Sequence, residues 1–205
     1  MEILMPFMKK NKTHISFLHL VRTYYRIESG MICAQDFSEA LSDDPFYEKI
    51  KEYVIGDSAA THEEAPSIKD PQAAPFKKKF DSLYTKAKAP KTLTLYRSHI
   101  MDGDDWEVGD SGVLNGYSKL LSCTDSKDQA LNLAKARNES DQDSGDYDDD
   151  PSPMHYVLEL KSVQASRIYF HHQYDKKVAS HHVQEQEVLI DPNSLKFKVI
   201  AVFGD

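Results

Sequence analysis

The sequence has few cysteines, no long apolar run and no excess of positive charge. Two of its 205 residues are cysteines, Cys33 and Cys123. Two are too few for a disulfide framework or a zinc site, and they suit a reducing compartment. No apolar run approaches the roughly 18 residues that cross a bilayer, and the first residues lack the charge order, apolar block and cleavage site of a secretory signal peptide. We therefore expect a soluble protein that is made in the cytoplasm and has no membrane span.

Negative charge is concentrated in one stretch of the chain. There are 25 basic and 33 acidic residues, a net charge of −8, and seven of the acids lie in residues 139–150, which contain no base. The rest of the chain is therefore almost neutral. Because a nucleic-acid-binding protein presents a basic face to the phosphates, we expect no nucleic acid among the partners. The acidic stretch is predicted to form a solvated loop.

The composition divides the chain into three parts. Apolar residues recur at helical spacing in residues 13–30 and again in residues 45–55, where an Asp-Pro pair forms the cap and first turn. A stretch rich in Ala, Ser, Glu and Pro follows, which is typical of a linker or mobile loop. We predict an N-terminal helical segment (residues 1–56), this linker (57–75) and a main domain (76–205).

The main domain begins with a helix that ends before Pro90 and is rich in strands after it. The runs that we interpret as strands are residues 92–97, 119–124, 156–160, 167–170, 185–190 and 197–203. One helix, over residues 128–137, interrupts them. Because strands and helices do not alternate regularly, a doubly wound parallel sheet is disfavoured and an α+β fold is predicted.

Two short motifs are better explained as loops than as catalytic or metal sites. Residues 109–112 (GDSG) match the sequence around the nucleophile of chymotrypsin-like proteases, with His62 upstream as a base, but that fold needs two barrels of strands. We therefore interpret residues 109–112 as a turn. The acidic stretch resembles a calcium loop only in charge, because Gly145 stands where a ligand is needed and no glutamate closes the loop.

Two histidine pairs raise the question of a metal site. His171-His172 and His181-His182 lie on either side of Asp175. Adjacent residues on a strand point to opposite faces, so at most one of each pair could join a shared site. We interpret them as solvated loop histidines, and we expect no metal.

Two glutamates lie at the start of a predicted buried strand. Glu185 and Glu187 lead into residues 188–190 (VLI), and on an extended chain residues i and i+2 share a face about 6.5–7 Å apart. One carboxylate can stabilise an oxocarbenium-like cation while the other handles a proton, as cleavage of a glycosidic bond requires. The alternative is a solubilising charge pattern at a sheet edge.

Four elements of the main domain occur in a characteristic order. They are Tyr96-Arg97 at the end of a strand, residues 121–124 (LSCT), a helix with Ala130 and Ala134, and Glu185-x-Glu187 followed by Val-Leu-Ile. Their order and spacing resemble the Arg–Ser–Glu signature of the cholera-toxin-like mono-ADP-ribosyltransferases, with 25 residues from Arg97 to Ser122 and 65 from Ser122 to Glu187. The resemblance covers about two thirds of the chain. It implies the split β-sandwich of that family, with a mixed or antiparallel sheet, preceded by N-terminal helices.

The resemblance implies an NAD site built on the two strands. In the family the strand arginine holds the phosphates and ribose side of NAD, and Arg97, with Tyr96 before it, occupies that position. Ser122 and Thr124 match the first and last residues of the family's Ser-Thr-Ser strand, which packs below the nicotinamide ribose. The chain departs from that pattern by having Cys123 in the middle and Thr124 at the end.

The resemblance also implies roles for the glutamates. Glu187 corresponds to the catalytic glutamate, which binds the ribose 2′-hydroxyl, stabilises the cation as nicotinamide leaves and accepts a hydrogen bond from Ser122. Glu185 matches the residue that deprotonates or orients the acceptor guanidinium in arginine-modifying members, so arginine is the favoured acceptor. Residues 171–184 would form the loop that recognises the target protein, with Tyr174 as its aromatic contact.

We therefore expect a monomeric enzyme that uses NAD as co-substrate and transfers ADP-ribose to a target protein. A small member of the family without a signal peptide resembles an effector or toxin that is delivered into the cytosol of a host cell. Two alternatives are an NAD glycohydrolase of the same fold, in which water replaces the acceptor, and a catalytically degenerate module that binds a partner. The acidic stretch is expected to point away from NAD, because its carboxylates would repel the diphosphate.

Overall fold

The computed structural model describes residues 34–55, 64–101, 106–144, 153–175, 178 and 186–204. Several of the sequence-based expectations lie outside the described residues. They are the helix over residues 13–30, His62, the end of the acidic stretch, the pair His181-His182 and Glu185.

Seven strands of the described chain form one antiparallel sheet. They are β1 (Thr92–Met101), β2 (Ser111–Leu114), β3 (Leu121–Thr124), β4 (Met154–Gln164), β5 (Ile168–His171), β6 (Glu187–Ile190) and β7 (Leu195–Phe203). Their order across the sheet is β2-β7-β4-β1-β3-β6-β5. Together with the helices, this sheet confirms the predicted α+β class, and each predicted strand overlaps an observed one.

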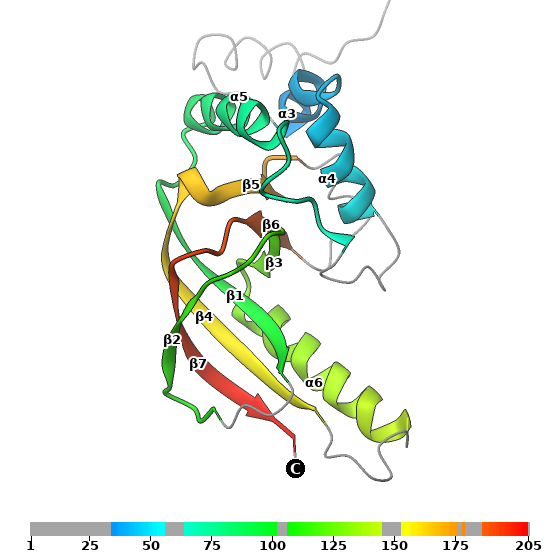
Figure 1. The fold of residues 1–205 in the computed structure, drawn as a ribbon, viewed down its shortest axis with the longest axis vertical. Helices are drawn as coiled ribbons and strands as arrows, with labels where there is room; N and C mark the ends of the chain where they lie inside the picture. Colours follow the sequence, from blue (N-terminus) through cyan, green and yellow to red (C-terminus); the bar gives the residue numbers. More distant parts are fainter. Residues whose placement is uncertain are drawn as a thin grey trace, which may run out of the picture.

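The sheet is nearly divided between β1 and β3. β1 pairs with β4 from Thr92 to Met101, but it pairs with β3 only at Tyr96 and Thr124. In Figure 1, β2, β7, β4 and β1 form one long curved layer, and the short strands β3, β6 and β5 lie together toward its upper end. The two halves therefore meet at a point where strands diverge and where side chains from both halves can approach one another.

Helix α6 (Lys127–Ser144) covers one face of the long layer (Figure 1). Its small residues Ala130 and Ala134 are fully buried against Val157 of β4, so the helix approaches the sheet closely. The helix continues through residues 139–144, so the prediction of a loop is wrong for this first half of the acidic stretch. One reason is that the carboxylate of Asp141 lies 2.8 Å from Nε2 of the buried His155, which attaches the last turns of the helix to β4.

Three helices, α3 (Ala34–Leu41), α4 (Pro45–Ile55) and α5 (Ala73–Lys86), gather at the β5 end of the sheet (Figure 1). α4 confirms the predicted helix and its cap, because the carboxylate of Asp44 accepts a hydrogen bond from the amide of Phe46 at 3.1 Å. Aromatic rings from these helices and from β5 pack together, among them Phe37, Phe46, Phe76, Phe80 and Tyr169. These rings join the sheet side chains in one continuous core.

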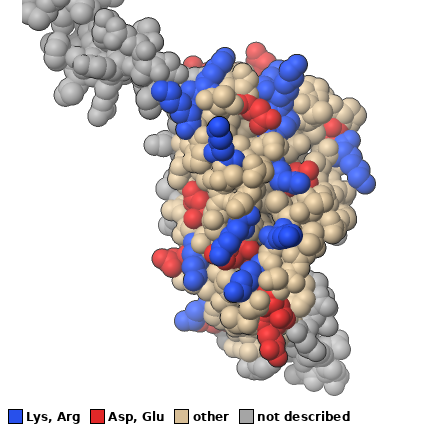
Figure 2. Space-filling model, turned by 90° about the vertical axis from the view of Figure 1, so that its left-hand side faces the viewer, with Lys and Arg blue, Asp and Glu red and all other residues tan. Residues whose placement is uncertain are grey.

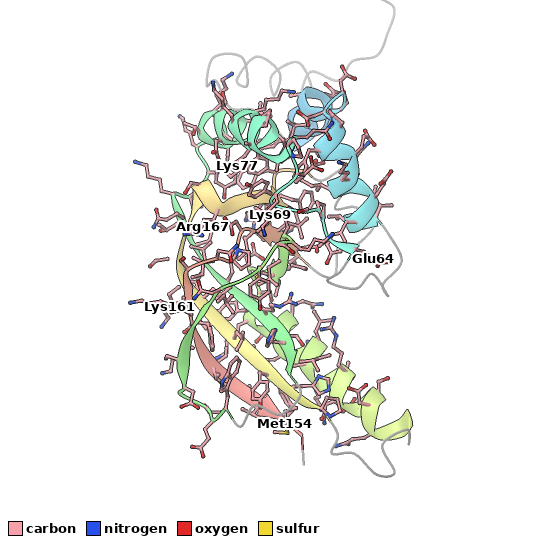
Figure 3. All side chains as sticks on the ribbon, viewed as in Figure 1. Glu64, Lys69, Lys77, Met154, Lys161 and Arg167 are labelled. Atoms are coloured by element: carbon pink, nitrogen blue, oxygen red, sulfur yellow. The ribbon has the colours of Figure 1, made fainter. Side chains whose placement is uncertain are left out.

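The described second half of the predicted linker is attached to the sheet. Ser67 forms an isolated bridge with Lys119, and Ala65 is fully buried. α5 then begins at Ala73, three residues earlier than the apolar pattern predicts. Figure 3 marks Lys77 on the underside of α5, above the region where Arg167 precedes β5. The ammonium group of Lys77 donates to the carbonyl oxygen of Ala165 at 3.3 Å, which connects this helix to the sheet.

Residues 109–112 combine a turn with the start of β2. Gly109 adopts a φ of 110°, which favours glycine, and Asp110 closes the turn by accepting a hydrogen bond from the amide of Glu107 at 2.9 Å. Gly112 is in the strand, where a Cβ atom would lie 2.6 Å from the ring of Phe197. Glycine disfavours strands, so the sequence pattern of residues 109–112 does not predict β2. The close packing of Phe197 explains why glycine is nevertheless suited to this position.

Charges of both signs are mixed on the face shown in Figure 2, which views the molecule from the left-hand side of Figure 1. Lysine and arginine side chains are spread over this face with acidic side chains between them. Lys161 of β4 and Lys196 and Lys198 of β7 are among the exposed lysines of the described chain.

No helix in the described ranges has both the length and the apolar character needed to span a membrane.

Candidate functional site

The structure brings four of the predicted site residues onto one face of the sheet. Tyr96 of β1 is the cross-strand partner of Thr124 of β3, and Thr124 is the partner of Glu187 of β6. Cross-strand partners share a face, with Cβ atoms about 4.5–5.5 Å apart. The three residues therefore form a row across three strands. Ser122, two residues before Thr124, is on the same face.

Glu187 is placed in this row by the chain that surrounds it. It is the first residue of β6 and only 7% exposed. Gln186 before it has a φ of 49°, an uncommon conformation for a non-glycine residue, which turns the chain into the strand. On the other side, the amide of His172 donates to the carbonyl oxygen of Glu187 at 3.1 Å. The backbone of Glu187 is thus held by β3 on one side and by the end of β5 on the other.

The strand register places Thr124 directly opposite Glu187 and Ser122 opposite Leu189. Ser122 is therefore a diagonal neighbour of Glu187, and its hydrogen bond to Glu187 stays a prediction. The hydroxyl of Thr124 accepts a hydrogen bond from the amide of Ser126 at 3.1 Å, and Ser126 in turn caps the N-terminus of α6 through the amide of Gln129.

The middle residue of this strand, Cys123, has a packing role. It points to the opposite face from Ser122 and Thr124 and is 4% exposed in the main core. Burial raises the pKa of its thiol to about 12; the charge of Arg97 opposes this shift and that of Glu187 adds to it. The thiol is therefore protonated at neutral pH and is not a nucleophile. The departure from threonine at this position changes the core rather than the face that carries Glu187.

The side chain of Arg97 links β1 to β3. Arg97 follows Tyr96, so it starts from the other face of β1, and its Nη1 donates to the carbonyl oxygen of Ser122 at 2.6 Å. Its Nε is buried and has no hydrogen-bond partner in the described part of the chain. Because a buried donor without an acceptor is destabilising, a group that supplied an acceptor to this Nε would stabilise the site.

A second group of polar side chains adjoins the row. Asp125 directly follows Thr124, and its Oδ2 lies 3.1 Å from Nε2 of His172, 4.0 Å from Nε2 of His171 and 3.0 Å from the side-chain Nε2 of Gln173. We call Asp125, His171 and His172 the Asp–His cluster. Burial tends to raise the pKa of Asp125, but the hydrogen bond from His172 and the charges of both histidines hold it below its ordinary value.

The Asp–His cluster corrects the interpretation of His171 and His172 as solvated loop residues on opposite faces. His171 is 2% exposed and the side chain of His172 is 18% exposed. Their rings stack with centroids 5.1 Å apart. The strand ends at His171 and residues 172–174 form a turn, so the alternation of faces no longer applies. Both imidazoles therefore reach the same carboxylate.

The Asp–His cluster is the group in the described chain that is close enough to hold a metal ion, because one ligand atom from each residue lies within 4.8 Å of the others. The hydrogen bonds favour a different arrangement. The amide of Gln173 donates to Nδ1 of His171 at 3.2 Å, so the proton of the neutral ring is on Nε2, the atom that faces Asp125. A protonated Nε2 is a donor and not a metal ligand, so the geometry favours a hydrogen-bonded group.

His171 predicts a pH dependence of stability. Burial is the main cause that lowers its pKa from 6.5 to about 4, the charge of His172 also lowers it, and the charge of Asp125 partly opposes the shift. Between these two values the unfolded chain binds a proton that the folded chain does not, so the free energy of unfolding falls as pH decreases from about 6.5 to about 4. We expect a loss on the order of 2–3 kcal/mol from this residue between pH 7 and pH 4.5.

Urea unfolding at these two pH values checks this expectation. The His171→Asn variant should lose less stability on acidification than the unaltered protein, whatever its stability at pH 7. Equal losses in the two proteins would contradict the assignment.

The remaining predicted site residues lie apart from the row or outside the residues that the structure describes. Tyr174 packs inward, with its ring 5.0 Å from that of Tyr84 and 5.1 Å from that of His171, and burial raises its pKa. In this structure Tyr174 supports the turn after β5. Glu185 lies outside the described residues, as does most of the segment expected to recognise the target.

A hollow at the β2 edge of the sheet has a different character. Its lining residues are Trp106, Asp110, Ser111, Gly112, Val113 and Phe197, with one ionisable side chain among them. The row and the Asp–His cluster combine carboxylates, hydroxyls and imidazoles from four strands or their ends, β1, β3, β5 and β6. They are therefore the better candidate for a functional site.

The sequence indicates Tyr96, Thr124 and Glu187 as candidate site residues, but it does not indicate the Asp–His cluster. An acid at the end of a strand, such as Asp125, is too common to indicate a site. A usable signal was present, since Asp125, His172 and Glu187 each stand at an end of a strand. The signal becomes informative only once β6 is known to lie between β3 and β5.

Comparison with protein-family models, curated proteins and solved structures finds no match to this chain.

Proposed function

We propose that this protein is an NAD-dependent mono-ADP-ribosyltransferase of the Arg–Ser–Glu class, with the split β-sandwich of that family. It transfers ADP-ribose from NAD to a protein side chain, and arginine is the favoured acceptor. On the same resemblance, we propose that it acts as an effector or toxin in the cytosol of a host cell.

The observation that supports this proposal best is the row formed by Tyr96, Thr124 and Glu187 at the division of the sheet. The row holds Glu187 itself, Tyr96 next to Arg97, and Thr124 on the strand of Ser122, so the three elements of the signature adjoin one another although they are far apart in sequence. Arg97 is tied to the same strand through the carbonyl oxygen of Ser122. Chance agreement of a sequence motif would not require its members to meet in space.

The chemistry available to these residues suits cleavage of the bond between nicotinamide and ribose. The guanidinium of Arg97 has an unpaired buried donor and a permanent charge, which fit a diphosphate. The carboxylate of Glu187 can stabilise the positive charge that develops on the ribose as nicotinamide leaves. The bond electrons go to nicotinamide, which departs as a neutral molecule, and the acceptor then forms a bond to the anomeric carbon.

One experiment separates the proposal from its alternatives. The purified protein is mixed with NAD labelled in its adenosine part and with a cell lysate, and labelled products are followed on gels and by chromatography. Label on a protein band supports transfer. Free ADP-ribose without labelled protein would favour an NAD glycohydrolase, and no NAD binding or consumption would favour a binding module.

Arg97 gives a narrower prediction about NAD binding. Arg97→Lys keeps the charge but removes the planar donor fork, so we expect NAD affinity to fall by about 10–100-fold, the range expected for a lost charge-assisted hydrogen bond. Isothermal titration calorimetry measures the change. Arg137→Lys, at an exposed position of α6, is the control and should bind NAD normally. Unchanged affinity in Arg97→Lys would contradict this role.

A further inference from the structure

The Asp–His cluster has a geometry that the proposed function leaves unused. Asp125 extends from the end of β3 and His172 from the end of β5, and they flank β6 at its first residue, Glu187. The amide of His172 is bonded to the carbonyl oxygen of Glu187, while its ring is bonded to Asp125. The imidazole is therefore fixed next to the residue proposed to stabilise the ribosyl cation.

The hydrogen bonds of His172 are those of an oriented base. A neutral imidazole whose Nε2 carries the proton donates it to the carboxylate of Asp125 at 3.1 Å, which leaves Nδ1 as an acceptor. No hydrogen bond of this Nδ1 occurs in the described part of the chain. A base whose far nitrogen is held by a carboxylate is the arrangement found where a side chain removes a proton from a nucleophile.

The surrounding turn holds this pair in place. The carbonyl oxygen of His171 accepts hydrogen bonds from the amides of Tyr174, at 3.0 Å, and Asp175, at 3.2 Å. The buried carboxylate of Asp175 is hydrogen-bonded by the hydroxyl of Tyr47 in α4. The neutral ring of His171 stacks on His172. The side chain of His172 nevertheless remains 18% exposed, so a substrate group can reach it.

We propose that His172, oriented by Asp125, is the general base that takes the proton from the acceptor during transfer. This inference rests on the proposed function. As the bond from the anomeric carbon to nicotinamide breaks, its electron pair neutralises the pyridinium ring. The lone pair of the acceptor nitrogen forms the new bond to the anomeric carbon, and its proton passes to Nδ1 of His172. The resulting imidazolium faces the carboxylate of Asp125, which stabilises its charge.

His172→Gln tests the base without removing the partner of Asp125, because a glutamine amide can still donate a hydrogen bond. Transfer of ADP-ribose to the acceptor protein should fall by about 10²-fold or more. The affinity for NAD should stay within about threefold, since the base acts on the acceptor and not on NAD. His99→Gln is the matched control, because His99 stacks on Trp106 of another region and should transfer normally.

Asp125 supplies the second arm. Asp125→Asn should reduce transfer because the imidazolium loses its counter-charge, and Asp125→Glu should restore part of the rate. This recovery distinguishes a carboxylate that positions and stabilises His172 from one that only supports the fold.

The outcomes separate this inference from the proposed function. If the unaltered protein neither binds NAD nor labels protein, both are wrong. If it transfers ADP-ribose and His172→Gln transfers at the same rate, only the role of His172 is wrong. Transfer that is lost on treatment with EDTA and restored by Zn²⁺ would assign the Asp–His cluster to a metal ion and also overturn the role of the base.

Discussion

The Glu187→Gln substitution is expected to reduce NAD consumption by about 10²–10⁴-fold, the usual effect of removing a positioned group that stabilises charge or moves a proton. Glutamine has the same shape and lacks the negative charge. The backbone at this position is held by β3 on one side and by His172 on the other. The fold should therefore survive, and both transfer and hydrolysis should be lost because both require cleavage of the bond to nicotinamide.

Release of nicotinamide, measured by chromatography, reports both reactions at once. Glu139→Gln, at an exposed position on α6 beside Lys135, is the control and should consume NAD at the normal rate. Glu185→Gln should reduce transfer while retaining some hydrolysis, because that residue is assigned to orienting the acceptor. Full activity in Glu187→Gln would contradict the proposed site.

The Phe76→Ala substitution is expected to lower the free energy of unfolding by about 3–5 kcal/mol. Phe76 is completely buried, and its ring lies 5.3 Å from that of Phe46 and 6.3 Å from that of Tyr169. It therefore connects α5 with α4 and with β5. Removing the ring takes away its burial energy and leaves a cavity that the surrounding aromatic side chains fill only in part.

Denaturation by urea, followed by circular dichroism, measures this loss. Ile55→Ala in the same helical layer is the control; its side chain is 42% exposed, so we expect a change of about 0.5 kcal/mol or less. A single unfolding transition would indicate that helices and sheet share one cooperative core. A loss below about 1 kcal/mol in Phe76→Ala would contradict the central position of this ring.

Local patterns were sufficient for most of the secondary structure. α4 begins at its Asp-Pro pair as predicted, because capping and first-turn preferences act within a few residues. β2 was missed because Gly112 weakens the strand pattern, and its reason for being there is the ring of Phe197 on another strand. α6 continued into the acidic stretch because Asp141 contacts the distant His155, a contact that no helical pattern contains.

The sequence by itself was sufficient to name Tyr96, Arg97, Ser122, Thr124 and Glu187 as candidate site residues. Their order and spacing along the chain resemble the family signature, and these are properties of the sequence alone. Strand alternation within residues 121–124 also indicates which side chains share a face.

The tertiary structure decided how these residues combine. Register is a relation between strands, so it alone placed Thr124 rather than Ser122 opposite Glu187. Strand order put β6 between β3 and β5 and brought Asp125 to His172 over 47 residues of sequence. The turn after His171 removed the alternation that had separated the two histidines. Strand pairing joins segments that are distant along the chain, so the sequence pattern of one strand does not predict which strands will pair with it.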